Sequence, residues 1–310
     1  MDYISLLQKE MRPAFGCTEP IALAYAAAKA VSVLDEFPNH IYARCSANII
    51  KNVKSVVIPN SGGRKGLAAA TVLGAIVGHP ERELEVLESA TDEDRKWLGM
   101  LLDSSFCTVE LAEGVDNLYI EITATTDEHT VVVRIENAHT NITYVSIDGE
   151  VLSETINEIK EAESSTCPMT FDSIYEFAKA GDISGILPSI KQQVEYNTAI
   201  SNEGLSNDYG ANIGQLLLLD DENPSLETKC KARAAAGSDA RMSGCPLPVV
   251  ICSGSGNQGL TVSMPIITAA EELGKSDDDL YRALVFANLL TLYVKSGIGK
   301  LSAYCGVVSA

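Results

Sequence analysis

Residues 118–147 read LYIEITATTDEHTVVVRIENAHTNITYVSI. Within this segment, β-branched and aromatic residues dominate three short runs, at 118–125, 130–135 and 143–147, and polar residues separate the runs. Such runs between turn residues are typical of strands that pair with their sequence neighbours. Together with a further β-rich run at 107–111, the segment predicts an antiparallel meander.

The sequence on either side of the meander has mostly helical character. Residues 1–35 and 66–77 carry apolar residues at helical spacing, residues 81–102 form a charged helical stretch, and the runs 41–50 and 55–58 favour strands. Beyond the meander the pattern is helical to the end of the chain. The helices expected there lie at 172–180, 183–201, 211–219, 227–237, 265–274 and 278–296.

The economical architecture for this pattern is an α+β fold with two domains. The polar and acidic stretch 154–168 marks a boundary between them. We therefore expect a mainly helical catalytic domain built from residues 1–36 and 154–310. An α/β domain that contains the antiparallel sheet, residues 37–153, is inserted into it.

The formal charge of −19 limits what the chain can bind. Nucleic acids and anionic membrane surfaces require clustered Lys and Arg, so neither is expected as a partner. A small zwitterionic molecule is compatible because its site is local. The longest apolar stretch, residues 285–294, is too short to span a bilayer, and the N-terminal segment lacks the apolar core of a signal peptide. We expect a cytoplasmic protein, and a homo-oligomer is compatible with the sequence.

Eight cysteines are spread along the chain, and none of them form a C-x-x-C pair. That spacing fits neither a zinc site nor a small disulfide scaffold. In a cytoplasmic protein of this size most cysteines are small buried apolar residues. Cys305, after a long apolar helix and a glycine-bearing turn, offers a thiolate to a soft metal centre, although one cysteine cannot hold a cluster.

Cys17 lies in the stretch Gly16-Cys17-Thr18-Glu19-Pro20, where Thr18 is expected as the N-cap of an Ala-rich helix and Pro20 sits in its first turn. The helix dipole and the free N–H groups at that place favour a thiolate. An activated thiol can serve as a base or as a nucleophile. The competing interpretation is a small buried residue in a tight turn.

The stretch Ser253-Gly254-Ser255-Gly256-Asn257-Gln258-Gly259 predicts a ligand-binding loop before a helix that begins near Pro265. Its glycines let the backbone approach a ligand, successive N–H groups can bind an anion, and the Asn and Gln side chains add polar contacts. The loop lacks the P-loop lysine, so a nucleotide is disfavoured. A flexible connection is the alternative.

Two further motifs carry candidate polar residues. Asp239 and Arg241, in a glycine-bearing stretch expected to be a loop at 237–244, either pair with each other or face a substrate, and by themselves they favour an internal ion pair. His139 and Asn141 lie at the start of the last strand, where a lone histidine is more often a structural group than a catalyst.

These motifs occur together and in this order in the L-cysteine desulfidase family, which is similar to the α chain of iron–sulfur L-serine dehydratase. The chain resembles that family over essentially its whole length. The matching stretches are 12–20, 58–63, 138–141, 238–242, 253–259, 264–265 and 301–305. The Cys-Thr-Glu-Pro and Ser-Gly-Ser-Gly-Asn-Gln-Gly motifs are the most specific of them.

The resemblance implies a [4Fe–4S] lyase that converts L-cysteine to pyruvate, ammonia and sulfide, or dehydrates L-serine. One iron without a protein ligand would act as a Lewis acid on the leaving group while a base removes the Cα proton. Cys17 matches the cysteine proposed as that base, and Cys305 matches one cluster ligand. The residues of the matching motifs that would bind the substrate are Thr18, Glu19, His139, Asn141, Asp239, Arg241, Ser253, Gly254, Ser255, Gly256, Asn257 and Gln258.

The sequence departs from the family pattern at its end. Family members continue beyond the position that matches Ala310 and carry further cysteines there. The resemblance therefore implies that the chain as given lacks the remaining cluster ligands, holds no cluster and is inactive. It also implies an uncovered apolar surface near residues 284–294 and 301–310, which would favour self-association.

Two other functions are compatible with the motifs. Ser255 to Gly259 resemble the Ser-x-Gly-Asn loop of pyridoxal-phosphate dehydratases, with Lys229 and Lys231 as candidate Schiff-base lysines, although helices surround the loop instead of alternating strands and helices. Alternatively, the chain is a non-catalytic protein that binds an amino acid and regulates. Titration with L-cysteine and L-serine, with turnover assayed in parallel, separates binding from catalysis.

Overall fold

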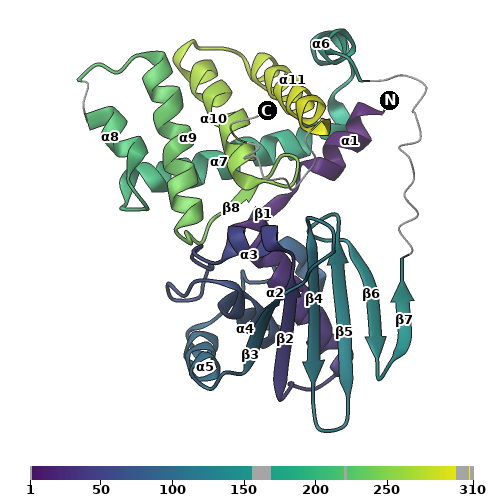
Figure 1. Ribbon diagram of the computed structural model, residues 1–310. Coiled ribbons are helices and arrows are strands. Elements are labelled where there is room, and N and C mark those ends of the chain that lie inside the picture. The colour runs from purple at the N-terminus through teal and green to yellow at the C-terminus, as the bar shows by residue number, and fades with distance from the viewer. Residues whose placement is uncertain (1, 156–168, 220–221, 298–306, 308–310) are drawn as a thin grey trace. The chain divides into compact units, whose positions relative to one another are not determined.

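The computed structural model describes residues 2–155, 169–219, 222–297 and 307. The chain forms two compact units, which we call the helical unit (Met1–Ala14 and Lys160–Ala310) and the sheet unit (Phe15–Ile159) (Figure 1). Helices together with a six-stranded and a two-stranded sheet make this an α+β fold, as the sequence predicts. None of the described helices has both the length and the apolar composition that crossing a bilayer requires.

The sheet unit is built around six strands in the order β3-β2-β4-β5-β6-β7. They are β2 (His40–Cys45), β3 (Cys107–Leu111), β4 (Tyr119–Thr125), β5 (Thr130–Glu136), β6 (Ile142–Ile147) and β7 (Glu150–Glu154). Strands β4 to β6 form an antiparallel meander as predicted, and β7 extends it. The run 107–111 was expected to belong to this meander, but as β3 it lies at the opposite edge of the sheet, beside β2. The sheet is mixed, because β3 runs parallel to β2 after a helical crossover connection.

Helices accompany this sheet. They are α2 (Thr18–Leu34), α3 (Ala47–Val53), α4 (Leu67–Val77), the 3-10 helix η1 (Pro80–Glu85) and α5 (Asp92–Asp103). Helix α2 packs against β4, β5 and α4 (Figure 1). The contact with α4 is close, since a Cβ added to Gly74 would lie 2.2 Å from the Ala24 carbonyl oxygen. These contacts place α2 with the sheet, whereas the expected boundaries put it in the helical domain with residues 1–36.

Residues 46–50 differ from the predicted strand at 41–50, because α3 begins there. The Ser46 hydroxyl caps this helix by accepting the Ile49 N–H at 3.4 Å, and it donates to the Asn117 carbonyl at 2.7 Å. A serine that satisfies a free N–H group favours helix initiation. The β-branched residues of this run therefore lie partly in a helix, where tertiary packing overrides their strand preference.

Glu121 is a charged centre of the sheet. The strand register places Arg44 of β2 and Arg134 of β5 directly opposite it. Both guanidinium groups pair with its carboxylate at 2.8 Å, and the Tyr119 hydroxyl donates to the carboxylate at 2.8 Å. Burial alone would raise the pKa of Glu121, but the hydrogen bonds from Arg134 and Tyr119 and the charges of both arginines outweigh it, so the pKa is lowered.

The helical unit contains the remaining elements. They are α1 (Tyr3–Glu10), β1 (Pro13–Phe15), whose last residue begins the sheet unit, α6 (Phe171–Ala180), η2 (Ser184–Ile186), α7 (Leu187–Ser206), α8 (Ile213–Leu219), α9 (Leu226–Met242), β8 (Pro248–Val250), α10 (Gly256–Glu272) and α11 (Asp277–Ser296). Helix α9 packs on α7, α8 and α10 (Figure 1). Strand β8 was not predicted, and it pairs with β1.

A buried amide holds α7 against β8 and α10. Asn197 is fully buried, and its Oδ1 accepts the Val250 N–H at 2.9 Å. Its Nδ2 donates to the Gly259 carbonyl at 3.2 Å and to the Ser263 hydroxyl at 2.9 Å. Because a buried amide left unpaired costs free energy, these bonds fix both ends of the segment between β8 and the first turn of α10.

Replacing Gly74 by Ala should destabilise the sheet unit by about 2 kcal/mol, because the new Cβ would overlap the Ala24 backbone, which cannot move without shifting α2. Gly99→Ala in α5 is the matched control. Its nearest contact is the end of the Arg64 side chain at 3.3 Å, so a gain in helix propensity of up to about 1 kcal/mol should dominate. Denaturant unfolding of both variants measures the difference, and equal stabilities would contradict the packing described.

Acid should destabilise the sheet unit through Glu121. Since its folded-state pKa is lowered from 4.5, the ionised carboxylate contributes stability above its unfolded pKa, and this contribution is lost as the pH falls through the folded value. Glu121→Gln should remove this part of the acid dependence and cost about 1–3 kcal/mol at neutral pH, because it leaves two arginines without their carboxylate. Unfolding curves of wild type and Glu121→Gln at neutral and acidic pH test this. If the free energy of unfolding falls equally with pH in both proteins, the prediction is wrong.

Candidate active site

Cys17 is the N-cap of α2, and Thr18, which was predicted to be the N-cap, is instead the first residue of the helix. The Cys17 side chain makes no capping hydrogen bond to the helix backbone. It is 6% exposed, and its thiol donates to Glu19 Oε2 at 3.1 Å. The thiol therefore lies at the positive end of a helix dipole and beside a carboxylate.

Glu19 has three described hydrogen-bond donors. Its Oε2 accepts from the Cys17 thiol and from the Thr18 hydroxyl at 3.2 Å, and its Oε1 accepts from Asn52 Nδ2 at 3.2 Å. A carboxylate within hydrogen-bond reach of a thiol can take its proton, so the pair can generate a thiolate. While the carboxylate is ionised, its negative charge opposes the helix dipole. Asn52 of α3 carries no sequence pattern that marks it, and the sequence analysis missed it.

Gly16 brings two separate motifs together. Its φ is +80°, and an added Cβ would lie 2.1 Å from Pro59 Cγ. Only glycine fits this left-handed position against a proline ring. The stretches 12–20 and 58–63, which the sequence resemblance singled out separately, therefore meet one residue before Cys17.

His139 and Asn141 lie between β5 and β6. Asn141 Nδ2 donates to the Glu136 carbonyl at 2.9 Å, so its amide stabilises the turn. His139 is buried, at 5% exposure. The Asn141 contact favours the structural interpretation, and a substrate-binding role for either residue stays a prediction.

Asp239 and Arg241 lie in the last turn of α9, although residues 237–244 were expected to form a loop. Asp239 Oδ2 accepts the Ile213 N–H at 3.0 Å and so caps the start of α8. Arg241 Nη1 donates instead to Asn257 Oδ1, at 2.9 Å. The predicted internal ion pair is wrong, since the two side chains have different described partners on different helices.

Helix α10 begins at Gly256, well before the predicted start at Pro265. The reason is Ser255, whose hydroxyl caps the helix by accepting the Gln258 N–H at 3.3 Å. The predicted binding loop at 253–259 is therefore a short turn followed by the first turn of a helix. The first turn of α10 is the positive end of the helix dipole, and this was one reason for expecting an anion site there.

The turn before α10 has an unusual backbone. Ser253 and Gly254 both have left-handed φ values, +51° and +76°. Reciprocal backbone hydrogen bonds of 3.1 Å between Cys252 and Ser255 close the turn around them. Glycine adopts this conformation freely, but a serine there is uncommon, and such residues occur often at functional sites.

Arg241 and Gln258 carry buried polar atoms that need partners. Both residues are 2% exposed. Among the described residues, Arg241 Nε and both amide atoms of Gln258 have no hydrogen-bond partner. Gly256 leaves the room that the guanidinium occupies, since an added Cβ would lie 2.2 Å from Arg241 Nε. Buried polar atoms without partners are costly, so this cluster fits a ligand that supplies acceptors and a donor.

Cys305, the predicted cluster ligand, lies outside the described residues. Among those that are described, no three His, Cys, Asp or Glu side chains are grouped so as to hold a metal. Burial raises the pKa of the Cys45, Cys107 and Cys252 thiols to about 12. A [4Fe–4S] cluster is held by cysteine thiolates, and the described residues by themselves do not fit one.

Comparison with known proteins assigns the chain to a family. The family model described as serine dehydratase alpha chain matches residues 81–310. A UPF0597 protein of Finegoldia magna is 46% identical over 312 residues, covering 100% of this chain and 74% of the relative. UPF0597 proteins of Lachnoclostridium phytofermentans and Fusobacterium nucleatum are 45% and 41% identical, each over 99% of this chain and 74% of the relative. The chain belongs to the serine dehydratase alpha chain family. No solved structure matches it.

Replacing Glu19 by Gln should slow alkylation of Cys17 by about tenfold at neutral pH. The substitution removes the carboxylate that accepts the thiol hydrogen at 3.1 Å, so the thiol loses the described group that can take its proton. Peptide mass spectrometry after timed iodoacetamide treatment follows Cys17 alone. Glu93→Gln, at an exposed position of α5, is the control and should leave the rate unchanged. A faster reaction in Glu19→Gln would show instead that the carboxylate charge keeps the thiol protonated.

Proposed function

We propose that this chain carries the substrate-binding and proton-transfer residues of a β-elimination lyase for a small L-amino acid. Its family supports a dehydratase or lyase-type role. The reaction we propose is the conversion of L-cysteine to pyruvate, ammonia and hydrogen sulfide, or the corresponding dehydration of L-serine. The observation that carries the proposal is the buried Arg241 in the last turn of α9, which lies beside the first turn of α10 and whose Nε has no hydrogen-bond partner among the described residues.

Arg241 is suited to bind the carboxylate of an amino acid. A guanidinium donates paired hydrogen bonds to a carboxylate, and burial strengthens them. Asn257 Oδ1 accepts from Arg241 Nη1 at 2.9 Å and so orients the group, while Nε stays available to a ligand. Gln258 adds a buried amide whose oxygen can accept from the substrate ammonium.

Cys17 is proposed as the base that removes the Cα proton. It must be a thiolate to do so, and Glu19 is the described group positioned to receive the thiol proton. Loss of the Cα proton and of the Cβ substituent, hydrogen sulfide from cysteine or water from serine, leaves aminoacrylate. Its imine tautomer reacts with water to give pyruvate and ammonia, so atoms balance without an oxidant.

A [4Fe–4S] cluster, proposed for this activity from the resemblance, would supply a Lewis acid for the leaving group. The described residues do not form a ligand set for it, so no step is assigned to the cluster here. The chemistry derived from this chain is limited to binding the carboxylate and moving the Cα proton.

The pyridoxal-phosphate alternative is disfavoured by the setting of both candidate lysines. Lys229 pairs with Glu272 at 2.6 Å, and Lys231 pairs with Glu227 at 2.5 Å. The Lys231 side chain is 63% exposed. A Schiff-base lysine is activated by desolvation or by a neighbouring cation, and exposed pairing with a carboxylate has the opposite effect.

Calorimetric titration tests the proposed ligand. L-Cysteine and L-serine should bind, and cysteamine and ethanolamine, which lack the carboxylate, should not. Pyruvate and sulfide release, assayed anaerobically in parallel, shows whether the chain also turns the bound amino acid over, and release of both products would identify it as a lyase. Equal binding of the amino acids and of the amines would contradict a carboxylate site.

Substituting Arg241 should weaken amino-acid binding in a graded way. Arg241→Met should lower the affinity for L-serine by at least about thirtyfold, because it removes a buried charge-assisted hydrogen bond worth about 2 kcal/mol or more. Arg241→Lys keeps the positive charge but lacks the planar set of donors. Its affinity for L-serine should therefore lie between those of wild type and Arg241→Met. Thermal unfolding identifies any variant that fails to fold. Unchanged affinity in a folded Arg241→Met would rule out this residue as the carboxylate ligand.

A further inference from the structure

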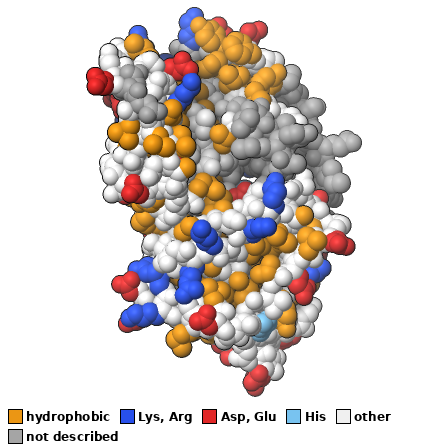
Figure 2. Space-filling model, turned by 60° about the vertical axis from the view of Figure 1, so that its left-hand side comes forward, with side chains coloured by type: hydrophobic (Ala, Val, Ile, Leu, Met, Phe, Trp, Pro, Cys, Tyr) orange, Lys and Arg blue, Asp and Glu red, His pale blue; other side chains and the backbone are white. Residues whose placement is uncertain are grey.

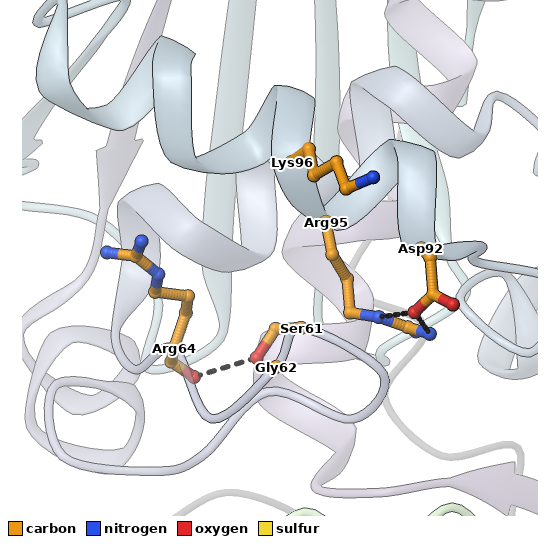
Figure 3. Close-up of a pocket in the computed structure, with 6 residues that line it drawn as sticks. All are labelled: Ser61, Gly62, Arg64, Asp92, Arg95 and Lys96. Atoms are coloured by element: carbon orange, nitrogen blue, oxygen red, sulfur yellow. Dashed lines mark hydrogen bonds and ion pairs between the residues drawn. The ribbon is translucent and has the colours of Figure 1, made fainter.

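The sheet unit has an open hollow of about 380 Å³ between the turn at 60–64 and α5. It is lined by Ser61, Gly62, Arg64, Asp92, Arg95 and Lys96. Arg64 lies on one side of the hollow and Arg95 and Lys96 on the other, with Ser61 and Gly62 between them (Figure 3). The volume falls in the range of small-molecule sites, about 300–1,000 Å³.

The hollow is positively charged although the chain carries −19. Three basic side chains and one carboxylate line it, which gives a net charge of +2. Asp92 pairs with Arg95 at 2.5 Å, while Arg64 and Lys96 form no ion pair with a described residue. Figure 2 shows several Lys and Arg side chains on the surface of the sheet unit, with Asp and Glu side chains among them. A bound anion would reduce the repulsion between these cations. Salt screens the acidic groups elsewhere on the chain, so they weaken the attraction of an anion to the hollow only slightly.

Hydrogen bonds hold the Arg95 side chain in a fixed position at the hollow. Its guanidinium donates twice to Asp92 Oδ1 and also to the carbonyls of Asn60 at 3.2 Å and Ala90 at 3.4 Å. These bonds tie the turn to the start of α5 and hold the guanidinium in place. Gly62, which has a left-handed φ of +71°, belongs to this turn and also lines the hollow.

We propose that this hollow binds a phosphate group, either free or on a small phosphorylated molecule. A dianion matches the net charge of +2, and a singly charged carboxylate would leave one cation uncompensated. Guanidinium groups present paired donors that fit phosphate oxygens, and the lysine adds a point charge. The site is distinct from the residues of the proposed lyase chemistry and does not depend on that function.

Titration of the chain with inorganic phosphate at constant ionic strength tests the site. We expect saturable binding of one phosphate per chain. Arg64→Glu and Lys96→Glu should each lower the affinity by at least about tenfold, because each places a negative charge beside the anion. Lys51→Glu, at an exposed position of α3 outside the hollow, makes the same change in net charge and should stay within about twofold of wild type.

A phosphate monoester, glycerol phosphate, distinguishes the two sources. Tighter binding of the monoester assigns the hollow to a phosphorylated metabolite, and tighter binding of inorganic phosphate assigns it to the free ion; either result supports the site. Lys96→Gln, which removes the charge without reversing it, should still weaken binding severalfold if a reversal variant fails to fold. Absence of saturable binding of both probes to folded wild type, or equal weakening in Lys51→Glu, overturns the proposal.

Discussion

The buried guanidinium of Arg241 is the constraint around which the candidate site is arranged. It is 2% exposed, and its described hydrogen bond to Asn257 is to a neutral amide oxygen. A buried cation is costly unless an anion or several acceptors compensate it. The surrounding elements keep this arrangement in place: Gly256 leaves space for the guanidinium, and Asn197 bonds to both β8 and α10. A substrate carboxylate would supply the missing charge.

The sheet unit contributes a different kind of chemistry. Cys17 and Glu19 form a thiol–carboxylate pair at a helix N-terminus, and Asn52 holds the second carboxylate oxygen. The left-handed Gly16, packed against Pro59, sets the chain direction into that helix. A proton acceptor and a carboxylate site are the two groups that deprotonation of an amino acid at Cα requires. In the proposed function these groups are Cys17 and Arg241.

Local sequence patterns predicted much of the fold. Runs of β-branched and aromatic residues between turn residues predicted β4, β5 and β6, and apolar residues at helical spacing predicted α4 and α11. The failures had physical causes that lie outside such patterns. Ser46 and Ser255 start helices by capping where β-branched residues and glycines indicated a strand and a loop. The parallel pairing of β3 with β2 depends on a long crossover, which no local pattern specifies.

The sequence motifs supplied the candidate residues, but they did not predict how these residues are arranged. Cys17, Arg241 and Asn257 were identified from their motifs, whereas the partner of each depended on packing. Asn197 could have been found, because it is spaced four residues from Gln193 and Ser201 on one buried helix face. Asn52 could not, since nothing near it in the sequence distinguishes it.

A crystal structure of the chain with L-cysteine, prepared anaerobically, tests the central claim most directly. The account predicts that the carboxylate lies within hydrogen-bond distance of Arg241 Nε, with Gln258 also engaged, at the first turn of α10. An amino acid bound elsewhere, with Arg241 Nε still unpaired, would contradict it.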